Sequence, residues 1–131
     1  MADSVSVWPE SSVIGVADGG AVETAVLTSV GIFTTAQQPK VLITGMINVV
    51  AGTAATQLIT KVRRGNSVSG PEIGTLLTDT VVDGDSYVLP LHVEDVPGES
   101  AGLQYTLTVT ETSATADGSV SVATMSITTH S

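Results

Sequence analysis

One stretch, residues 103–112, alternates strictly between apolar and polar side chains and constrains the fold more than any other feature. Leucine, tyrosine, leucine and valine at positions 103, 105, 107 and 109 share one side, and glutamine and threonines occupy the other. This period of two is typical of a β-strand that buries one face and exposes the other to water. Turn sequences rich in Gly, Pro or Asp flank the stretch at 97–102 and 116–119. The rest of the chain repeats this order, which predicts an all-β fold.

Three other predicted strands carry more specific information. Residues 40–50 are apolar on both faces, which indicates a strand covered by the core on one side and by a neighbour on the other. Pro90 cannot donate a ladder hydrogen bond, so the predicted strand 86–93 lies at an edge or is interrupted there. In residues 119–129 the apolar positions change parity, which predicts a bulge near residues 123–124. Phe33, the only phenylalanine, is expected in the core.

About eight predicted strands favour one antiparallel β-sandwich or jelly roll. We expect an extended N-terminal arm over residues 1–20, which ends at Asp18-Gly19-Gly20, and the jelly-roll domain over residues 21–131. Trp8, the only tryptophan, either packs on its own domain or anchors the arm in a neighbouring chain, because Trp is frequent in interface hot spots. The sequence lacks an apolar run of about 18 residues and a secretory signal, so no membrane partner is expected.

The charges are segregated along the chain. The net charge of −9 argues against a nucleic-acid partner, because phosphates would be repelled. Residues 40–64 contain all the basic residues and no acid, whereas residues 72–117 contain nine acids and no base. This arrangement either joins opposite charges across a subunit interface or places solvated charges in loops. The candidate interface residues are Trp8, Lys40, Lys61, Arg63 and Arg64.

No catalytic constellation is recognisable. The chain has two histidines, His92 and His130, no cysteine and no Gly-x-Ser-x-Gly elbow, so neither a nucleophilic triad nor a zinc site is expected. Asp79, Asp83 and Asp85, with Glu94 and Asp95, either supply oxygen ligands to calcium or belong to an ordinary Asp-Gly-Asp turn and its neighbours. We therefore expect no enzyme activity, no cofactor and no assigned metal site.

Four segments, taken in order, carry a resemblance to known proteins. They are KVLITGMINV at 40–49, LITKVRRG at 58–65, EDVPG at 94–98 and YTLTV at 105–109. This order resembles small accessory structural proteins of tailed bacteriophages, which in turn resemble the trimeric jelly roll of tumour-necrosis-factor-like domains. The resemblance covers residues 40–127 and includes no sharp site motif, so no functional residue is carried over.

The resemblance implies a capsid decoration (cement) protein on the exterior of the virion. Such a protein would form a homotrimer and clamp neighbouring subunits of the major capsid protein. The alternative is a phage tail-fibre or receptor- or carbohydrate-binding β-sandwich module. That alternative needs an exposed aromatic platform, for which the chain offers one Trp, two Tyr and one Phe. An enzyme on a jelly-roll scaffold is disfavoured by the missing histidine and carboxylate constellation.

Overall fold

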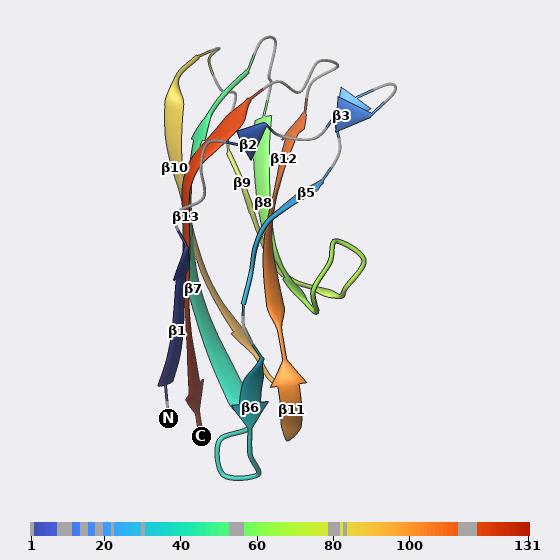
Figure 1. The fold of residues 1–131 in the computed structure, drawn as a ribbon, viewed down its shortest axis with the longest axis vertical. Helices are drawn as coiled ribbons and strands as arrows, with labels where there is room; N and C mark the ends of the chain where they lie inside the picture. The colour runs from blue at the N-terminus through green and yellow to red at the C-terminus, as the bar shows by residue number, and fades with distance from the viewer. Residues whose placement is uncertain are drawn as a thin grey trace.

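The protein is described here from a computed structural model. It describes residues 2–7, 12–13, 16–17, 20–21, 23–29, 31–52, 57–78, 82, 84–112 and 118–131. These residues form β-strands and turns (Figure 1). The described ranges include no helix long and apolar enough to cross a membrane.

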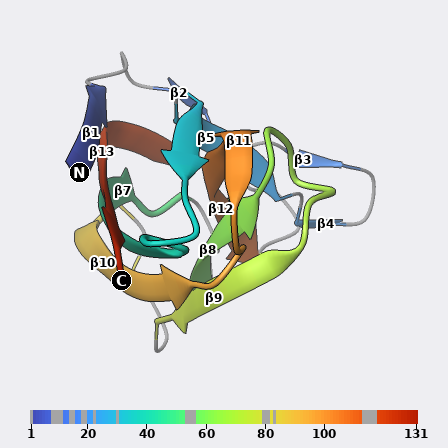
Figure 2. The same cartoon turned by 90° about the horizontal axis from the view of Figure 1, so that it is seen from below.

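Two antiparallel sheets pack face to face and contain the eight main strands of the described chain (Figures 1 and 2). The first sheet has the order β1 (Ala2–Val7), β13 (Ser119–His130), β7 (Lys40–Val50) and β10 (Ser86–Asp95). The second sheet has the order β5 (Thr24–Thr28), β12 (Tyr105–Thr112), β8 (Gln57–Arg64) and β9 (Glu72–Leu77).

Five short strands complete the described structure. Strand β2 (Ser12–Val13) pairs with β13, and β3 (Val16–Ala17) pairs with β4 (Gly20–Ala21). Strand β6 (Ile32–Thr34) pairs with β11 (Ser100–Leu103) and closes one end of the sandwich (Figure 1).

The strand order is that of a jelly roll. When the eight main strands are numbered along the chain, the first sheet reads 1-8-3-6 and the second reads 2-7-4-5. Successive main strands therefore alternate between the sheets, except for the β8–β9 pair, which stays in one sheet. This interleaving is the double Greek key of jelly rolls. The predicted antiparallel sandwich of about eight strands is confirmed.

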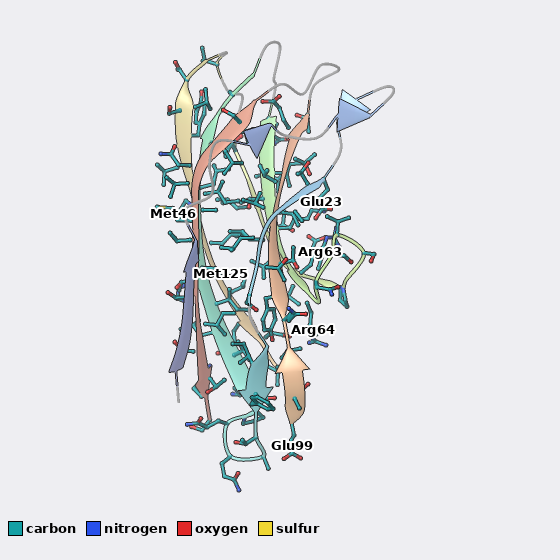
Figure 3. The ribbon with its side chains drawn as sticks, in the orientation of Figure 1. Glu23, Met46, Arg63, Arg64, Glu99 and Met125 are labelled. Carbon is teal, nitrogen blue, oxygen red and sulfur yellow. The ribbon has the colours of Figure 1, made fainter. Side chains whose placement is uncertain are left out.

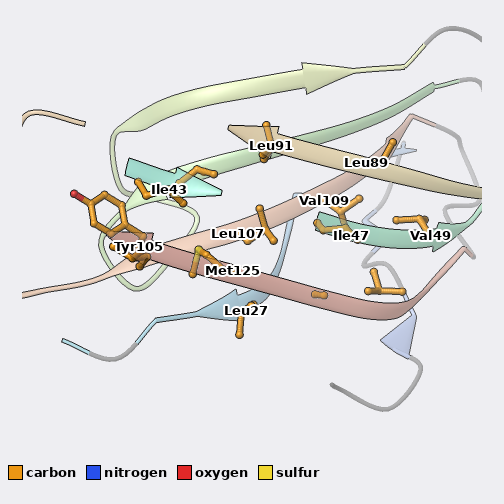
Figure 4. Close-up of a cluster of buried hydrophobic side chains, with 14 of the residues drawn as sticks. Leu27, Ile43, Ile47, Val49, Leu89, Leu91, Tyr105, Leu107, Val109 and Met125 are labelled. Carbon is orange, nitrogen blue, oxygen red and sulfur yellow. The ribbon is translucent and has the colours of Figure 1, made fainter. Parts of the chain in front are cut away.

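The core lies between the two sheets and is built from aliphatic side chains (Figure 4). In strand β7 the odd-numbered residues are buried in the core; that a neighbour covers its even-numbered side stays a prediction. Strand β10 also buries its odd-numbered side and lies at the edge of the first sheet, as Pro90 predicted. The most buried large side chains include Tyr105, Ile32, Ile43, Ile47, Leu58, Leu107, Met125 and Ile127.

The alternating stretch 103–112 differs from the prediction in two ways. The ladder is interrupted at Gln104, which separates β11 from β12. The polar side of β12 is not solvated, because Thr106 and Thr108 are fully buried. The Thr106 hydroxyl donates to the carbonyl of Gly65, and the Thr108 hydroxyl donates to Glu23. Gly65 and Glu23 therefore lie over the outer face of β12. The alternating sequence of the strand does not reveal this cover.

Two further predictions are wrong in detail. Phe33 is 68% exposed, because the neighbouring Ile32 and Thr34 take the inward positions of the three-residue strand β6. The bulge in β13 lies between Val120 and Val122, slightly before the predicted residues 123–124. The bulge restores the inward direction of the apolar side chains that follow it.

The N-terminal segment is described only in part. Strand β1 pairs along β13, so residues 2–7 form the edge of the first sheet. Trp8 lies outside the described residues. The division into an arm over residues 1–20 and a domain over residues 21–131 stays a prediction.

Candidate interaction surfaces

The outer face of the second sheet carries a bidentate ion pair. Arg63 on β8 donates from Nε to Oε2 of Glu23 at 2.6 Å and from Nη2 to Oε1 at 2.7 Å. Thr108 on β12 donates to the same carboxylate at 2.6 Å. The hydrogen bond from Arg63 holds the pKa of Glu23 below its usual value, although burial acts to raise it. Figure 3 shows the pair on the side of β5 and β8 away from the first sheet.

A second ion pair lies on the same face and is more open to solvent. Nζ of Lys61 lies 3.3 Å from Oε2 of Glu72. The Thr75 hydroxyl also donates to Glu72, and this hydrogen bond, followed by that from Lys61, lowers the pKa of the Glu72 carboxyl. Because Glu72 is 42% exposed, such a pair contributes only about 0–1 kcal/mol to stability.

A third cluster connects the two sheets at one edge. Asp95 ends β10 in the first sheet, and Arg64 ends β8 in the second. Arg64 binds Asp95 through Nε–Oδ2 at 2.8 Å and Nη2–Oδ1 at 2.5 Å. The hydroxyl of Tyr105 on β12 donates to Oδ2 at 2.7 Å. The carboxylate is 6% exposed, so these donors replace the water that it loses.

The pKa values in this cluster follow from its geometry. Burial raises the pKa of Asp95, but hydrogen bonds from Arg64 and Tyr105 outweigh burial and leave the carboxyl pKa below its usual value. Burial, and then the adjacent carboxylate, raise the pKa of the Tyr105 phenol. The cluster therefore holds Asp95 ionised and Tyr105 protonated at neutral pH.

The structure brings together three of the predicted interface residues. Lys61, Arg63 and Arg64 lie on β8 and each pairs with an acid of the same chain. Lys40 begins β7 in the other sheet, and Trp8 lies outside the described residues. Glu72 and Asp95 belong to the acidic segment 72–117, so two of the three pairs join the segregated charges within one chain. Whether these residues also contact another subunit stays a prediction.

Both histidines and one of the first three aspartates of the possible cation site lie in the part of the chain that the structure describes. His92 is exposed on β10, and Nε2 of His130 lies 3.1 Å from Oε2 of Glu94. Asp85 is exposed, whereas Asp79 and Asp83 lie outside the described residues. Among the described residues, no group of three or more histidine or carboxylate side chains is placed to hold a metal ion.

Sequence reasoning missed a buried carboxylate at the opposite end of β12. Glu111 is fully buried. The backbone N–H of Gly52 donates to its Oε2 at 2.7 Å, and the N–H of Gly118 donates to its Oε1 at 3.2 Å. Glu111 therefore joins the segment after β7 to the segment before β13. The sequence contained a sign of this burial, because the odd-numbered residues Leu107 and Val109 of the same strand point into the core and Glu111 is the next odd-numbered residue.

Sequence reasoning also missed an exposed aromatic residue. Phe33 projects from β6 between two inward residues, Ile32 and Thr34, which are 0% and 3% exposed. Gly31 packs closely on Gly102 of β11, and Thr34 donates to the carbonyl of Gly98 at 2.5 Å. Phe33 is the largest of the exposed hydrophobic side chains in the described ranges.

Comparison with known proteins reveals the fold but no sequence family. No protein-family profile and no curated protein sequence matches the chain. The structure of infectious bursal disease virus strain Gt contains a chain with a TM-score of 0.65 and 12% identity, covering 99% of this chain and 33% of that chain. A mutant VP2 protein of the same virus, from T=1 particles, has a TM-score of 0.64, 13% identity and coverage of 99% and 32%.

A different class of protein shares the fold less closely. Arabinose-bound MgGH51 α-L-arabinofuranosidase has a TM-score of 0.51 and 10% identity, covering 89% of this chain and 19% of that chain. This chain spans about a third of the length of each viral chain that it matches. At these identities the likeness concerns architecture, so the chain is an antiparallel jelly-roll β-sandwich similar to part of a viral particle protein.

Proposed function

We propose that the chain is a structural virion protein that forms a homotrimer, decorates the exterior of a phage capsid and clamps neighbouring major capsid subunits. The observation that carries this proposal is the match of nearly the whole chain, 99%, to a protein found in viral particles. The sequence resemblance to phage accessory proteins supports it independently. Because one fold can serve several functions, the surfaces of this chain decide between a capsid-binding role and other roles.

The construction of the sandwich suits a structural role. Its sheets are connected by a buried hydrogen-bonded carboxylate, Asp95, and a second buried carboxylate, Glu111, fixes two loops. Buried polar groups of this kind are costly unless each is satisfied, and when satisfied they favour one rigid arrangement. A rigid body that keeps its shape can brace neighbouring subunits of a shell.

Phe33 is the residue that we place in contact with the capsid. It is exposed on a fixed strand at one end of the sandwich, where β6 and β11 close the fold (Figure 1). Three copies in a trimer would present three such residues. Binding through several weak contacts at once raises the effective affinity without a large contact area in each.

The test is the copy number of the chain in purified virions. Particles of the virus that encodes the chain would be purified and analysed by quantitative mass spectrometry, with the major capsid protein as internal standard. A decoration protein is expected at a copy number comparable with that of the capsid subunit. A copy number of only a few per particle would instead favour the tail-fibre or receptor-binding alternative. Absence from the particle would contradict both.

A rebinding assay tests the clamp itself. Particles stripped of the chain would be heated with and without added purified protein, and genome release would be followed by dye fluorescence. The added chain is expected to raise the temperature of release. Binding without any such rise would contradict stabilisation by clamping. The expectation that the chain is not an enzyme stays a prediction.

A further inference from the structure

The outer face of the first sheet differs from that of the second in charge. On β7, β10 and the part of β13 after its bulge, the outward residues have even numbers. The register aligns them in rows across the three strands. The two central rows contain Pro90, Met46 and Thr124, and His92, Thr44 and Ser126.

Lys, Arg, Asp and Glu are absent from most of this described face. The exceptions are Lys40 and Glu94, which lie near the start of β7, where Glu94 also pairs with His130. We call the outward surface of β7, β10 and β13 beyond this end the uncharged face. By contrast, the outer face of the second sheet carries the ion pairs of Arg63 and Lys61.

The uncharged face is open in the single chain. Val88 is 57% exposed, and Thr44, Pro90 and His92 are also exposed. Figure 3 shows Met46 pointing away from the second sheet, whereas Met125 points between the sheets. A shallow hollow of about 220 Å³ lies on this face and is lined by Thr44, Gly45, Met46, Thr124 and Ser126.

The face is of a size that can contribute to a specific contact. Strand β7 has 11 residues, so at about 3.3 Å per residue it is about 36 Å long. Strands β7, β10 and β13 at a spacing of about 4.8 Å give the face a width of about 14 Å. The resulting area of up to about 500 Å² is more than half of the roughly 800 Å² that each partner buries in a typical specific interface.

We propose that a second copy of this chain covers the uncharged face. Each copy has a net charge of −9, so two copies repel each other where their acidic surfaces meet. When the next copy approaches over the uncharged face, this copy places no carboxylate against it and no ion pair is broken. It buries Val88, Met46 and Pro90, while Lys40, Glu94 and His130 remain at the rim, as charged residues do in protein interfaces.

This inference rests on the homotrimer of the proposed function and assigns its contact surface. In a closed ring of three, the contact is heterologous, so each copy covers the uncharged face of the next copy. The uncharged face also accounts for the two-sided apolar character of residues 40–50. Their odd-numbered side chains fill the core, and their even-numbered side chains face the neighbouring copy.

The test places a charge at the centre of the face. Thr124→Asp puts a carboxylate beside the hollow, and His92→Glu puts one at an exposed position on the edge strand, where folding is not at risk. The matched control is Thr110→Asp, the same substitution on β12, a central strand of the second sheet. Mass in solution would be measured by light scattering over a concentration series, with circular dichroism to confirm folding.

The wild-type chain is expected to form an oligomer. Thr124→Asp and His92→Glu are expected to weaken it at least about tenfold, because a buried unpaired charge costs more than the roughly 1.4 kcal/mol that a tenfold change represents. The control is expected to keep the wild-type mass. A wild-type monomer throughout the concentration series would overturn the inference, and so would an oligomer that both face variants leave intact. Equal weakening by Thr110→Asp would also overturn it.

The outcomes separate this inference from the proposed function. A wild-type dimer that dissociates in the face variants would support the uncharged face as the contact and contradict the trimer. A monomer that still binds capsids would overturn the inference and leave capsid decoration supported. An oligomer that uses this face but is absent from virions would support the inference and contradict the proposed function.

Discussion

The phenolic oxygen of Tyr105 on β12 lies 2.7 Å from Oδ2 of Asp95 on β10, and its hydroxyl donates to that carboxylate. This hydrogen bond crosses from the second sheet to the first. Arg64 and the backbone N–H of Val96 donate the remaining hydrogen bonds to the Asp95 carboxylate. A carboxylate that is 6% exposed therefore has donors on both oxygens, which is the condition for burying a charge without a large loss of stability.

Tyr105→Phe should destabilise the protein by about 1.5–3 kcal/mol, the usual contribution of a hydrogen bond to a charged group. The ring keeps its packing, so the loss reports on the hydroxyl. Urea unfolding followed by circular dichroism would measure it as a lower midpoint with an unchanged slope. The matched control is Tyr87→Phe, because the Tyr87 hydroxyl accepts an exposed hydrogen bond from the N–H of Val82. Equal losses in the two variants would contradict a special role for Tyr105.

Acid should unfold the chain by protonating its paired carboxylates. The pKa values of Asp95 and Glu23 are lower in the folded chain than in the unfolded chain. The stability from these pairs is fully present above the unfolded carboxyl pKa of about 4 and is lost as the pH falls toward the lower folded values. We expect the urea midpoint to fall steeply below about pH 4–5.

Asp95→Asn provides the control for the acid prediction. This variant should be less stable at pH 7 and should lose less stability on acidification, because one of the protonating groups has been removed. Wild-type and variant curves that remain parallel down to pH 3 would show that Asp95 is not among the groups responsible.

Gly74→Ala should destabilise the protein because β9 packs tightly against β10. A Cβ at position 74 would lie 2.0 Å from Cγ1 of Val93, and valine has little rotational freedom to move aside. Overpacking of this kind costs about 1–3 kcal/mol. The double variant Gly74→Ala with Val93→Ala should recover part of the loss. Thermal unfolding of the four proteins in this cycle would measure the coupling, and simple additivity would contradict the clash.

Phe33→Thr should leave stability nearly unchanged and weaken capsid binding. A side chain that is 68% exposed contributes little to folding, so we expect a change within about 0.5 kcal/mol. Co-sedimentation with stripped particles should show at least about a tenfold loss of affinity if the ring is a binding hot spot. Val68→Thr, on the turn beside the second sheet and 40% exposed, is the control. Unchanged binding of the Phe33 variant would remove this residue from the capsid contact.

The all-β class and most strand positions follow from the sequence, because period-2 alternation is a local property of each strand. The predicted strand over residues 40–50 has the observed limits, and Pro90 correctly indicated an edge strand. In contrast, burial of a polar face depends on segments far along the chain. Thr106 and Thr108 are buried where they donate hydrogen bonds to the turn at Gly65 and to the side chain of Glu23.

The sequence predicted which charged residues form the candidate interaction surfaces, but it did not predict which acid each basic residue pairs with. The sequence alone determined that the basic residues are few, segregated from the acids and partly clustered on one strand, and it determined the aliphatic core. Only the tertiary structure decided that Arg64 pairs with Asp95 and that Phe33 is exposed. The physical reason is that each of these outcomes depends on which strands become neighbours. In a jelly roll most successive strands lie in different sheets, so the decisive contacts join residues that are distant in sequence.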